Sequence, residues 1–300
     1  MTKTLKIRNS TTGTARFPSL LCLVFVLLSL TAHALEVQPE RGFHRSGHAV
    51  YVIAHRGAHN GVPENSIPAY TRAIALGSDF IEIDVRATKD GHFVSIHNPT
   101  IKAYTEGRDG LVSDMTLSEL MSLDIGRRIG PEWVNTKVPT FEQILALCKG
   151  KAGIYLDLKV PAVAELMKII KRYGMEKDVI WYIPLDFYTQ IGAQPFGNSF
   201  PMPDPGNAEN LKTLLQHQNV AVVATDMGAL TPEFIQIAHD NNVMVFVDEH
   251  EGSVAEWQKM LKWKVDGIQT DHPERLIKYL NSSQTQPMAT SEKPPPAAIP

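Results

Sequence analysis

The sequence has little cysteine and no large excess of charge of either sign. Its 300 residues include only 2 Cys, which excludes a small fold held together by several disulfides. The formal net charge of -3 argues against non-specific binding to nucleic acid, which requires a basic surface. With 43% hydrophobic and 20% charged residues, the composition also excludes collagen-like, coiled-coil and wholly disordered classes. One large domain or two small ones both remain compatible with this length.

The amino-terminal segment lacks acidic residues before Glu36 and contains one apolar run, residues 20–30. Basic residues precede the run, and Ala32 and Ala34 follow it at the two positions that a signal peptidase reads. The run would span about 16 Å as a helix, less than a bilayer core. We therefore expect residues 1–34 to be a secretory signal peptide, with an uncleaved anchor as the alternative. Cleavage would give an exported protein, periplasmic or secreted, without a stable membrane anchor.

The carboxyl-terminal residues 282–300 have five prolines, no aromatic residue and one branched aliphatic side chain. Such a segment cannot bury enough apolar surface to offset the entropy of ordering it, so we expect a disordered tail. The folded domain is then predicted at residues 48–281. After signal cleavage its only cysteine would be Cys148, which lies in an apolar run typical of a buried helix.

Short β-rich runs alternate with helical patterns through this domain, and no Gly-rich nucleotide-binding loop follows any of them. Such alternation favours a parallel sheet. Eight candidate strands suggest a closed barrel, with an open doubly wound sheet as the competitor. The candidates are residues 49–55, 79–85, 92–97, 153–159, 179–184, 220–226, 243–249 and 266–271.

Two stretches interrupt this alternation. Residues 98–140 carry turn signals and one short helix near 116–123, which predicts a small insertion after the third strand. Residues 185–210 are rich in Pro, Gly and aromatic residues and are predicted to be a long loop. Loops of that length in compact domains are usually functional or disordered, and we expect this one to shape the alcohol side of a pocket.

Charged residues fall on the predicted strands, where a barrel sequence should be nearly all apolar. Glu82 and Asp84 are two residues apart, so their side chains point to the same face. Two buried carboxylates would repel each other and lose hydration. A divalent cation between them would resolve both problems.

Further polar groups lie at or near the carboxyl ends of other predicted strands, where barrel enzymes have their sites. Asp157 and Lys159 repeat the two-residue spacing, and His55 and His97 each end a strand. Oxygen ligands without cysteine favour Ca²⁺ or Mg²⁺ over zinc. Histidines serve as acid and base near neutral pH, while lysine and Arg56 suit an anionic phosphate. The set predicts metal-assisted phosphodiester chemistry.

The order of these motifs resembles the glycerophosphodiester phosphodiesterase family. Residues 55–100 carry that family's His-Arg-Gly, Pro-Glu-Asn, Glu-x-Asp and second His in sequence. Residues 116–126 and 266–276 also resemble its later segments, so the resemblance runs from about residue 50 to 280. The resemblance implies a single-domain TIM (β/α)8 barrel.

The resemblance also implies roles for the polar residues. His55 and His97 would be the acid–base pair, Glu82, Asp84 and Asp157 would hold the metal, and Arg56 and Lys159 would contact the substrate phosphate. The implied reaction is hydrolysis of a small-molecule glycerophosphodiester to glycerol 3-phosphate and an alcohol. The attacking group could be the neighbouring glycerol hydroxyl or water, and the sequence leaves both open.

The chain departs from the family's pattern at three places. Asn98 stands where an Asp usually follows the second His, and Asp157 where a Glu is usual. Residues 245–250 replace a segment that usually carries a Trp-Thr pair, a change expected to alter the wall against the alcohol. These departures affect the expected substrate more than the expected reaction.

Several residues are weaker candidates for the site. Asn65 could hydrogen-bond near the site or cap a helix. The acidic residues Asp248, Glu249 and Glu251 could form a solvated loop, which we favour, or a second cation site. His59 and His272 lie near strand ends in unknown directions.

Two other functions remain open at this point. A phospholipase of related barrel chemistry could act on intact lipid, with Phe187, Tyr188, Phe196 and Phe200 of the long loop touching a membrane. A non-catalytic binder of phosphate ligands could keep the same fold, but binding alone needs no acid–base pair.

Overall fold

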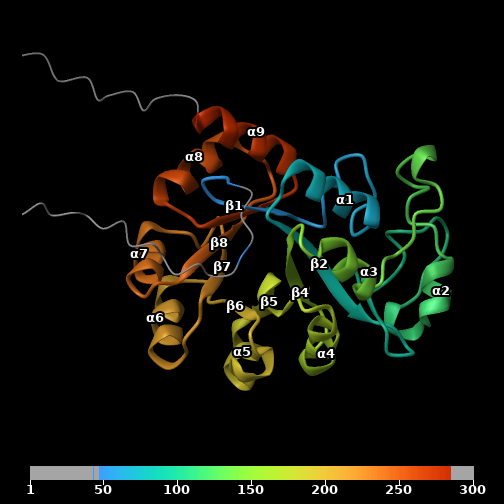
Figure 1. Cartoon of the computed structure of the whole chain (residues 1–300), viewed down its shortest axis with the longest axis horizontal. Helices are drawn as coiled ribbons and strands as arrows, with labels where there is room; N and C mark the ends of the chain where they lie inside the picture. The colour runs from blue at the N-terminus through green and yellow to red at the C-terminus, as the bar shows by residue number, and fades with distance from the viewer. Residues whose placement is uncertain (1–42, 44–46, 285–300) are drawn as a thin grey trace, which may run out of the picture. The chain divides into compact units, whose positions relative to one another are not determined.

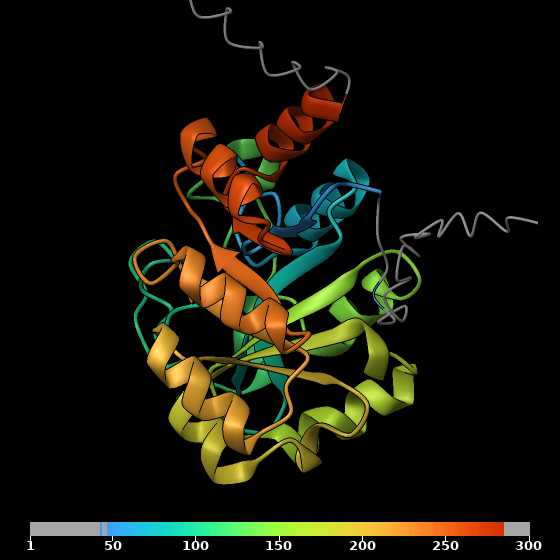
Figure 2. The ribbon, with the colours of Figure 1, turned by 90° about the vertical axis from the view of Figure 1, so that its left-hand side faces the viewer.

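The computed structural model describes residue 43 and residues 47–284, which belong to one compact unit. Eight parallel strands form a nearly closed barrel, and helices surround it (Figures 1 and 2). Along the sheet the barrel strands lie in the order β6-β5-β4-β2-β1-β9-β8-β7. The strands are β1 (Tyr51–Ala54), β2 (Phe80–Ala87), β3 (Phe93–Ser95), β4 (Gly153–Leu158), β5 (Val179–Pro184), β6 (Phe200–Asp204), β7 (Val222–Asp226), β8 (Met244–Asp248) and β9 (Gly267–Thr270).

Five of the described helices begin at a residue whose side chain caps them. Ser66, Thr116, Thr140, Asn207 and Thr231 each accept a backbone N–H at a helix start. The helices are α1 (Ile67–Leu76), α2 (Leu117–Ser122), α3 (Phe141–Cys148), α4 (Val163–Tyr173), α5 (Leu185–Ile191), α6 (Ala208–His217), α7 (Pro232–Asp240), α8 (Val254–Trp263) and α9 (Pro273–Gln284). Cys148 is fully buried on α3, as predicted, and burial raises the pKa of its thiol to about 12.

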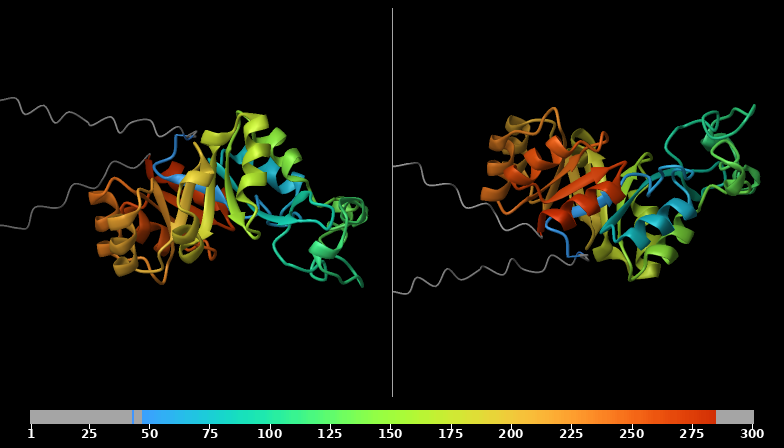
Figure 3. Two further views of the ribbon diagram at one scale, coloured as in Figure 1. Left: turned by 90° about the horizontal axis from the view of Figure 1, so that it is seen from below. Right: turned by 90° about the horizontal axis from the view of Figure 1, so that it is seen from above.

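The third predicted strand does not belong to the barrel. β3 pairs antiparallel with the end of β2, where Val85 lies opposite Ser95. The insertion follows β3 as predicted and has a small apolar core of its own, which includes Tyr104, Leu120 and Val138. Figure 3 shows these segments, in teal and green, extending from the barrel beside β2. The sequence pattern could not separate β3 from a barrel strand, because a short apolar run carries no sign of strand direction.

The expectation of a long loop at residues 185–210 was wrong. This segment contains a barrel strand that the sequence analysis missed. Residues 185–191 form α5, and residues 200–204 form β6, which pairs in parallel with β5. Pro201 and Pro203 made this segment look unlike a strand, because proline cannot donate to a sheet ladder and within sheets occurs mainly on edge strands. In the described part of the chain β6 has a ladder to β5 alone, and β7 lies beside its other edge without one.

Two layers of apolar side chains stabilise the barrel. Inside it, residues such as Ile53, Phe80 and Met202 form one cluster. Between the strands and the helices lies a larger cluster, to which α5 and the following segment contribute Tyr188 and Phe196. The segment at 185–210 is therefore structural, and shortening it would remove part of the core.

We expect Phe196→Ala to lower the free energy of unfolding by about 3–5 kcal/mol, because the ring is fully buried and would leave a cavity. The ring packs edge-on against Trp181 with centroids 5.3 Å apart. Urea unfolding of wild type and variant measures the loss. Leu111→Ala is the control, since Leu111 is 45% exposed and exposed changes cost within about 0.5 kcal/mol. Equal stability of the two variants would contradict the assignment of Phe196 to the core.

Two predicted segments lie largely outside the described residues. The predicted signal peptide, residues 1–34, falls there entirely. α9 continues to Gln284, three residues past the predicted domain end, and the rest of the predicted tail lies outside the description. Among the described residues, we find no helix with the length and apolarity needed to cross a membrane.

Candidate active site

The predicted site residues meet at the carboxyl ends of the barrel strands. His55 directly follows β1, Glu82 and Asp84 lie in β2, and Asp157 lies in β4. The parallel register places Asp84 directly beside Asp157 on the neighbouring strand. Because alternate residues of a strand share a face, Glu82 and Asp84 point the same way, as the spacing predicted.

Three carboxylates form an acidic cluster at this mouth. One oxygen each from Glu82, Asp84 and Asp157 lies within 4.8 Å of the others. Glu82 and Asp84 are 2% and 1% exposed. Burial, together with the charges of Asp84 and Asp157, raises the pKa of Glu82 well above its usual value. The cluster therefore holds more negative charge than its surroundings favour.

Lys159 offsets part of this charge. Its ammonium lies 2.5 Å from Asp157 Oδ2 and 3.2 Å from Asp84 Oδ1. Burial opposes the charge of Lys159, but the two carboxylates outweigh it and the pKa of the amine is raised. Burial also raises the pKa of Asp157, despite the nearby ammonium.

Arg56 contacts the cluster through its backbone and its side chain. Its N–H donates to Glu82 Oε2 at 2.7 Å, and its Nε lies 3.7 Å from Asp84 Oδ2. The residue has φ 51°, a left-handed conformation that a side chain disfavours and that functional sites often retain. The next residue, Gly57, cannot be replaced by a residue with a side chain without a clash, because a Cβ there would lie 2.8 Å from Ala69.

Asn65 orients Asp84 and does not cap the following helix, whose cap is Ser66. Its Nδ2 donates to Asp84 Oδ2 at 2.8 Å. Its Oδ1 accepts hydrogen bonds from Tyr70 and Ser95, each at 2.8 Å. This buried network settles the two readings of Asn65 in favour of a contact at the site.

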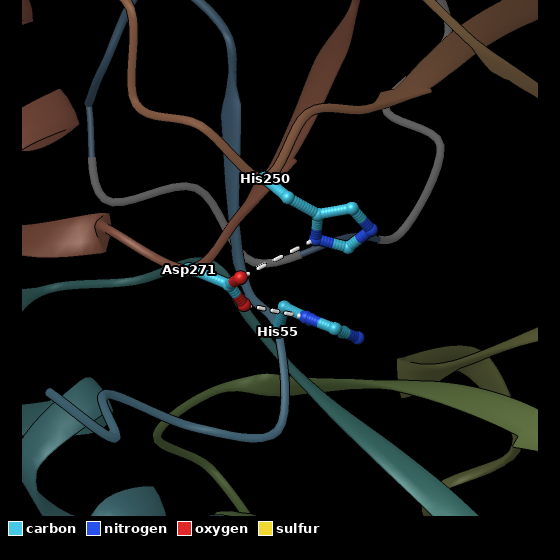
Figure 4. Close-up of side chains that lie close together, drawn as sticks. All are labelled: His55, His250 and Asp271. Carbon is cyan, nitrogen blue, oxygen red and sulfur yellow. Dashed lines mark hydrogen bonds and ion pairs between the residues drawn. The ribbon is translucent and has the colours of Figure 1, made fainter.

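His55 is held by an aspartate that the sequence analysis did not single out. Its Nδ1 lies 2.6 Å from Oδ1 of Asp271 (Figure 4). The same oxygen lies 3.0 Å from His59 Nε2. Burial opposes the charge of Asp271, but the ion pair with His250 and the hydrogen bonds from His55 and His59 outweigh it and hold the pKa of this carboxyl well below its usual range. An ionised carboxylate can only accept, so the proton of a neutral His55 lies on Nδ1. The other ring nitrogen, Nε2, lies 4.0 Å from Glu82 Oε2.

His97 lies on the Asp157 side of the cluster, close enough for its charge to lower the pKa of that carboxyl. Its Nδ1 lies 2.9 Å from Asn98 Oδ1. Arg86 donates two hydrogen bonds, at 2.6 and 2.9 Å, to the carbonyl oxygen of His97. Asn98 thus takes the orienting position that an aspartate usually takes in the family, without its charge.

The acidic cluster fits a hard divalent cation. All its donors are carboxylate oxygens, the type that Ca²⁺ and Mg²⁺ prefer. Asp84 Oδ1 is buried and receives no hydrogen bond of regular geometry from the described residues, although Lys159 lies beside it. A cation at the cluster would offset the repulsion that raises the pKa of Glu82.

The acidic residues at the end of β8 and just after it, Asp248, Glu249 and Glu251, do not form one solvated loop. Glu249 is 2% exposed and accepts hydrogen bonds from Gly252 N–H at 2.6 Å and Trp257 Nε1 at 2.9 Å. Asp248 accepts a hydrogen bond from Gln269 Nε2 at 2.8 Å. Of the three, Glu251 is exposed, as a solvated loop requires.

Sequence reasoning missed Asp271 and His250 as site residues. Asp271 ends the last predicted strand, so the strand-end criterion that selected His55 would have found it. His250 lies beyond a strand end in a segment that departs from the family's pattern, and its ring centroid is 4.5 Å from that of His55. No sequence signal gave its direction.

Comparison with known proteins identifies a matching family and fold. Residues 55–183 match the Glycerophosphoryl diester phosphodiesterase family. A glycerophosphodiester phosphodiesterase of Caldanaerobacter subterraneus subsp. tengcongensis is 36% identical over 250 residues, which cover 75% of this chain and 96% of that protein.

Solved structures agree with this match at the level of the fold. A glycerophosphodiester phosphodiesterase from Agrobacterium tumefaciens has a TM-score of 0.69 at 24% identity, covering 76% of this chain and 99% of that one. An Oleispira antarctica phosphodiesterase in complex with the product sn-glycerol-3-phosphate has a TM-score of 0.66 at 21% identity, covering 80% and 98%.

Proposed function

The chain belongs to the glycerophosphoryl diester phosphodiesterase family, and from this premise we propose that it hydrolyses glycerophosphodiesters to glycerol 3-phosphate and an alcohol. One observation carries the proposal beyond family membership. A histidine oriented by a carboxylate, His55 on Asp271, faces a cluster of three carboxylates 4.0 Å away. A proton-transfer group and a cation site thus share one mouth, as metal-assisted hydrolysis of a phosphodiester requires.

His55 is one member of the acid–base pair. Asp271 keeps its Nδ1 protonated, so Nε2 is the nitrogen that exchanges a proton with substrate. The carboxylate also stabilises the imidazolium that forms when Nε2 takes up a proton.

His97 is the other member; it lies near Asp157, whereas His55 lies near Glu82. Asn98 Oδ1 accepts from its Nδ1, which leaves Nε2 for the reaction. One histidine takes the proton of the attacking hydroxyl or water, and the other gives a proton to the departing alcohol oxygen. This division requires the two groups to lie on opposite sides of the phosphorus.

Arg56 and Lys159 bind the phosphate. Each lies within 4 Å of Asp84, so both cations border the place where the phosphate would sit. Glu82, Asp84 and Asp157 would hold a divalent cation, Ca²⁺ or Mg²⁺, which would supply positive charge near the phosphate oxygens. Without positive charge here, the three carboxylates would repel an anionic substrate.

The proposal is tested by incubating purified protein with glycerophosphocholine and, separately, with intact phosphatidylcholine, with and without added Ca²⁺ or Mg²⁺. We expect glycerol 3-phosphate from the first substrate in the presence of metal. Release of phosphocholine or choline from the intact lipid alone would replace the proposed activity with that of a phospholipase. Binding of glycerophosphocholine without turnover would make the protein a binder.

The phospholipase alternative has lost its structural support. Tyr188 and Phe196 are fully buried, and Phe187 and Phe200 are half-buried and pack against the core. The four rings therefore do not form a membrane-facing surface.

We also propose that the protein is exported, on the strength of the basic, apolar and small-residue segments in residues 1–34. The amino-terminal sequence of the protein made in its native host tests this. A mature chain beginning at Leu35 supports cleavage, and an intact Met1 contradicts it.

A further inference from the structure

Four side chains, beginning with His55, contact one another in a row at the ends of the neighbouring strands β1, β9 and β8. Asp271 follows β9, and its Oδ1 lies 2.6 Å from His55 Nδ1. Its second oxygen, Oδ2, lies 3.6 Å from Nδ1 of His250 (Figure 4). His250 Nε2 in turn lies 3.1 Å from Oδ2 of Asp248, the last residue of β8. Gln269 Nε2 donates to the other oxygen of Asp248 at 2.8 Å.

Both nitrogens of His250 are therefore engaged by carboxylates. Ion pairs with Asp248 and then Asp271 raise the pKa of His250 to about 10, so the ring is an imidazolium at neutral pH. Because both nitrogens face carboxylates, the ring has no free donor for a substrate. It acts on its neighbours, and its side chain is 47% exposed at the mouth.

We propose that His250 is a positioning residue for the phosphodiesterase reaction: by fixing Asp271 Oδ2 from β8, it holds the carboxylate whose other oxygen orients His55. Asp271 lies beyond the end of β9 and is 28% exposed. His55 and His59 both contact its Oδ1, so Oδ2 needs an anchor of its own to fix the orientation of the carboxylate. His250 supplies that anchor, and Asp248 with Gln269 fixes His250. The inference rests on the role proposed for His55.

Residues 245–250, which differ from the family's sequence pattern, therefore have a different role from the one expected. The segment was expected to alter the wall against the alcohol. Its first and third polar residues, Asp248 and His250, instead connect β8 to the carboxylate on His55. The second, Glu249, instead accepts hydrogen bonds from the backbone of Gly252 and from Trp257 of α8.

The first measurement is steady-state kinetics of His250→Ala with glycerophosphocholine and saturating metal. Lost orientation of His55 should lower kcat by about 10–100-fold, the range found when an outer partner of an active-site group is removed, with KM changed less than about twofold. His250→Arg should keep most of the activity, because a guanidinium can pair with two carboxylates at once. Added imidazole should restore part of the activity of His250→Ala, since the site is half exposed.

A matched control is His239→Ala. His239 also pairs with an aspartate, Asp266, at 2.9 Å, but it lies on α7, outside the mouth. We expect wild-type kcat from this variant. A double variant tests the route of the effect: His250→Ala should cost little more in an Asp271→Asn background, because both changes remove the same orientation. Additive losses would mean that His250 acts by another route and would overturn the inference.

A second readout does not depend on activity. The short contact between His55 Nδ1–H and Asp271 should give a far-downfield proton resonance in NMR spectra. It should be absent from His55→Ala, which assigns it, and shifted or broadened in His250→Ala but not in His239→Ala. An unchanged resonance together with unchanged kcat overturns the inference. If the wild type hydrolyses no glycerophosphodiester, the proposed function fails, and the resonance alone decides whether His250 positions His55.

Discussion

Replacing either His55 or His97 with alanine is expected to lower kcat at least about a hundredfold, since general acid–base groups contribute 10²–10⁴-fold. Each side chain borders the acidic cluster, and each has one nitrogen held by a neighbouring oxygen acceptor. Neither is part of the apolar clusters that stabilise the barrel, so the variants should fold and bind metal. Hydrolysis of glycerophosphocholine at saturating metal measures the effect.

The matched control is His217→Ala. His217 is exposed in the last turn of α6, and its removal should leave kcat unchanged. Near-normal turnover by His55→Ala or His97→Ala would remove that histidine from the acid–base pair. A fall in the control as large as in the test variants would point to misfolding, which a thermal melt would reveal.

Loss of the cation is expected to have the second large effect. Chelation should abolish hydrolysis, and Ca²⁺ or Mg²⁺ should restore it. Asp84→Asn should weaken metal binding at least about a hundredfold, because outer partners of metal ligands already contribute 10–100-fold. Metal should raise the melting temperature of the wild type, since the three carboxylates come together only in the folded state. Calorimetric titration and thermal melts measure the two effects.

Asp157 gives the sharper test, because it is a methylene shorter than the glutamate usual in the family. Asp157→Asn should weaken binding by removing a charge. Asp157→Glu should bind more tightly if a water bridges Asp157 to the ion, and more weakly if the contact is direct and closely fitted. Asp186→Asn, at an exposed carboxylate on α5, is the control and should bind metal normally. Full activity in chelator, with normal binding by Asp157→Asn, would contradict the metal site.

The acidic cluster could be predicted from sequence because its information is local. Glu82 and Asp84 are two residues apart on one strand, and strand periodicity alone puts both on one face. The barrel architecture then brings Asp157 beside them, because parallel strands end at the same edge. The alternation of strands and helices favoured that architecture but left an open doubly wound sheet as a competitor, and the family resemblance implied the barrel.

The partners of His55 could not be predicted in this way. Asp271 is 216 positions away along the chain, and whether it meets His55 depends on where the last strand closes against the first. The orientation of His250 depends on a loop conformation after β8. β6 was missed for the opposite reason, because local signals from Pro201 and Pro203 contradict the strand that tertiary packing imposes.

The missing ladder between β6 and β7 makes the barrel a sheet with two ends. In a fully hydrogen-bonded ring every strand protects the backbone of two others, whereas here β6 and β7 each have a ladder on one side only. This seam is where strand amides should exchange hydrogen with solvent earliest, because opening it breaks side-chain packing but no ladder. Exposed strand edges also invite pairing with other chains, and proline is a common protection against it. Pro201 and Pro203 lie on β6 at this seam and offer no backbone N–H to a strand from another chain, so we expect them to disfavour edge-to-edge pairing there.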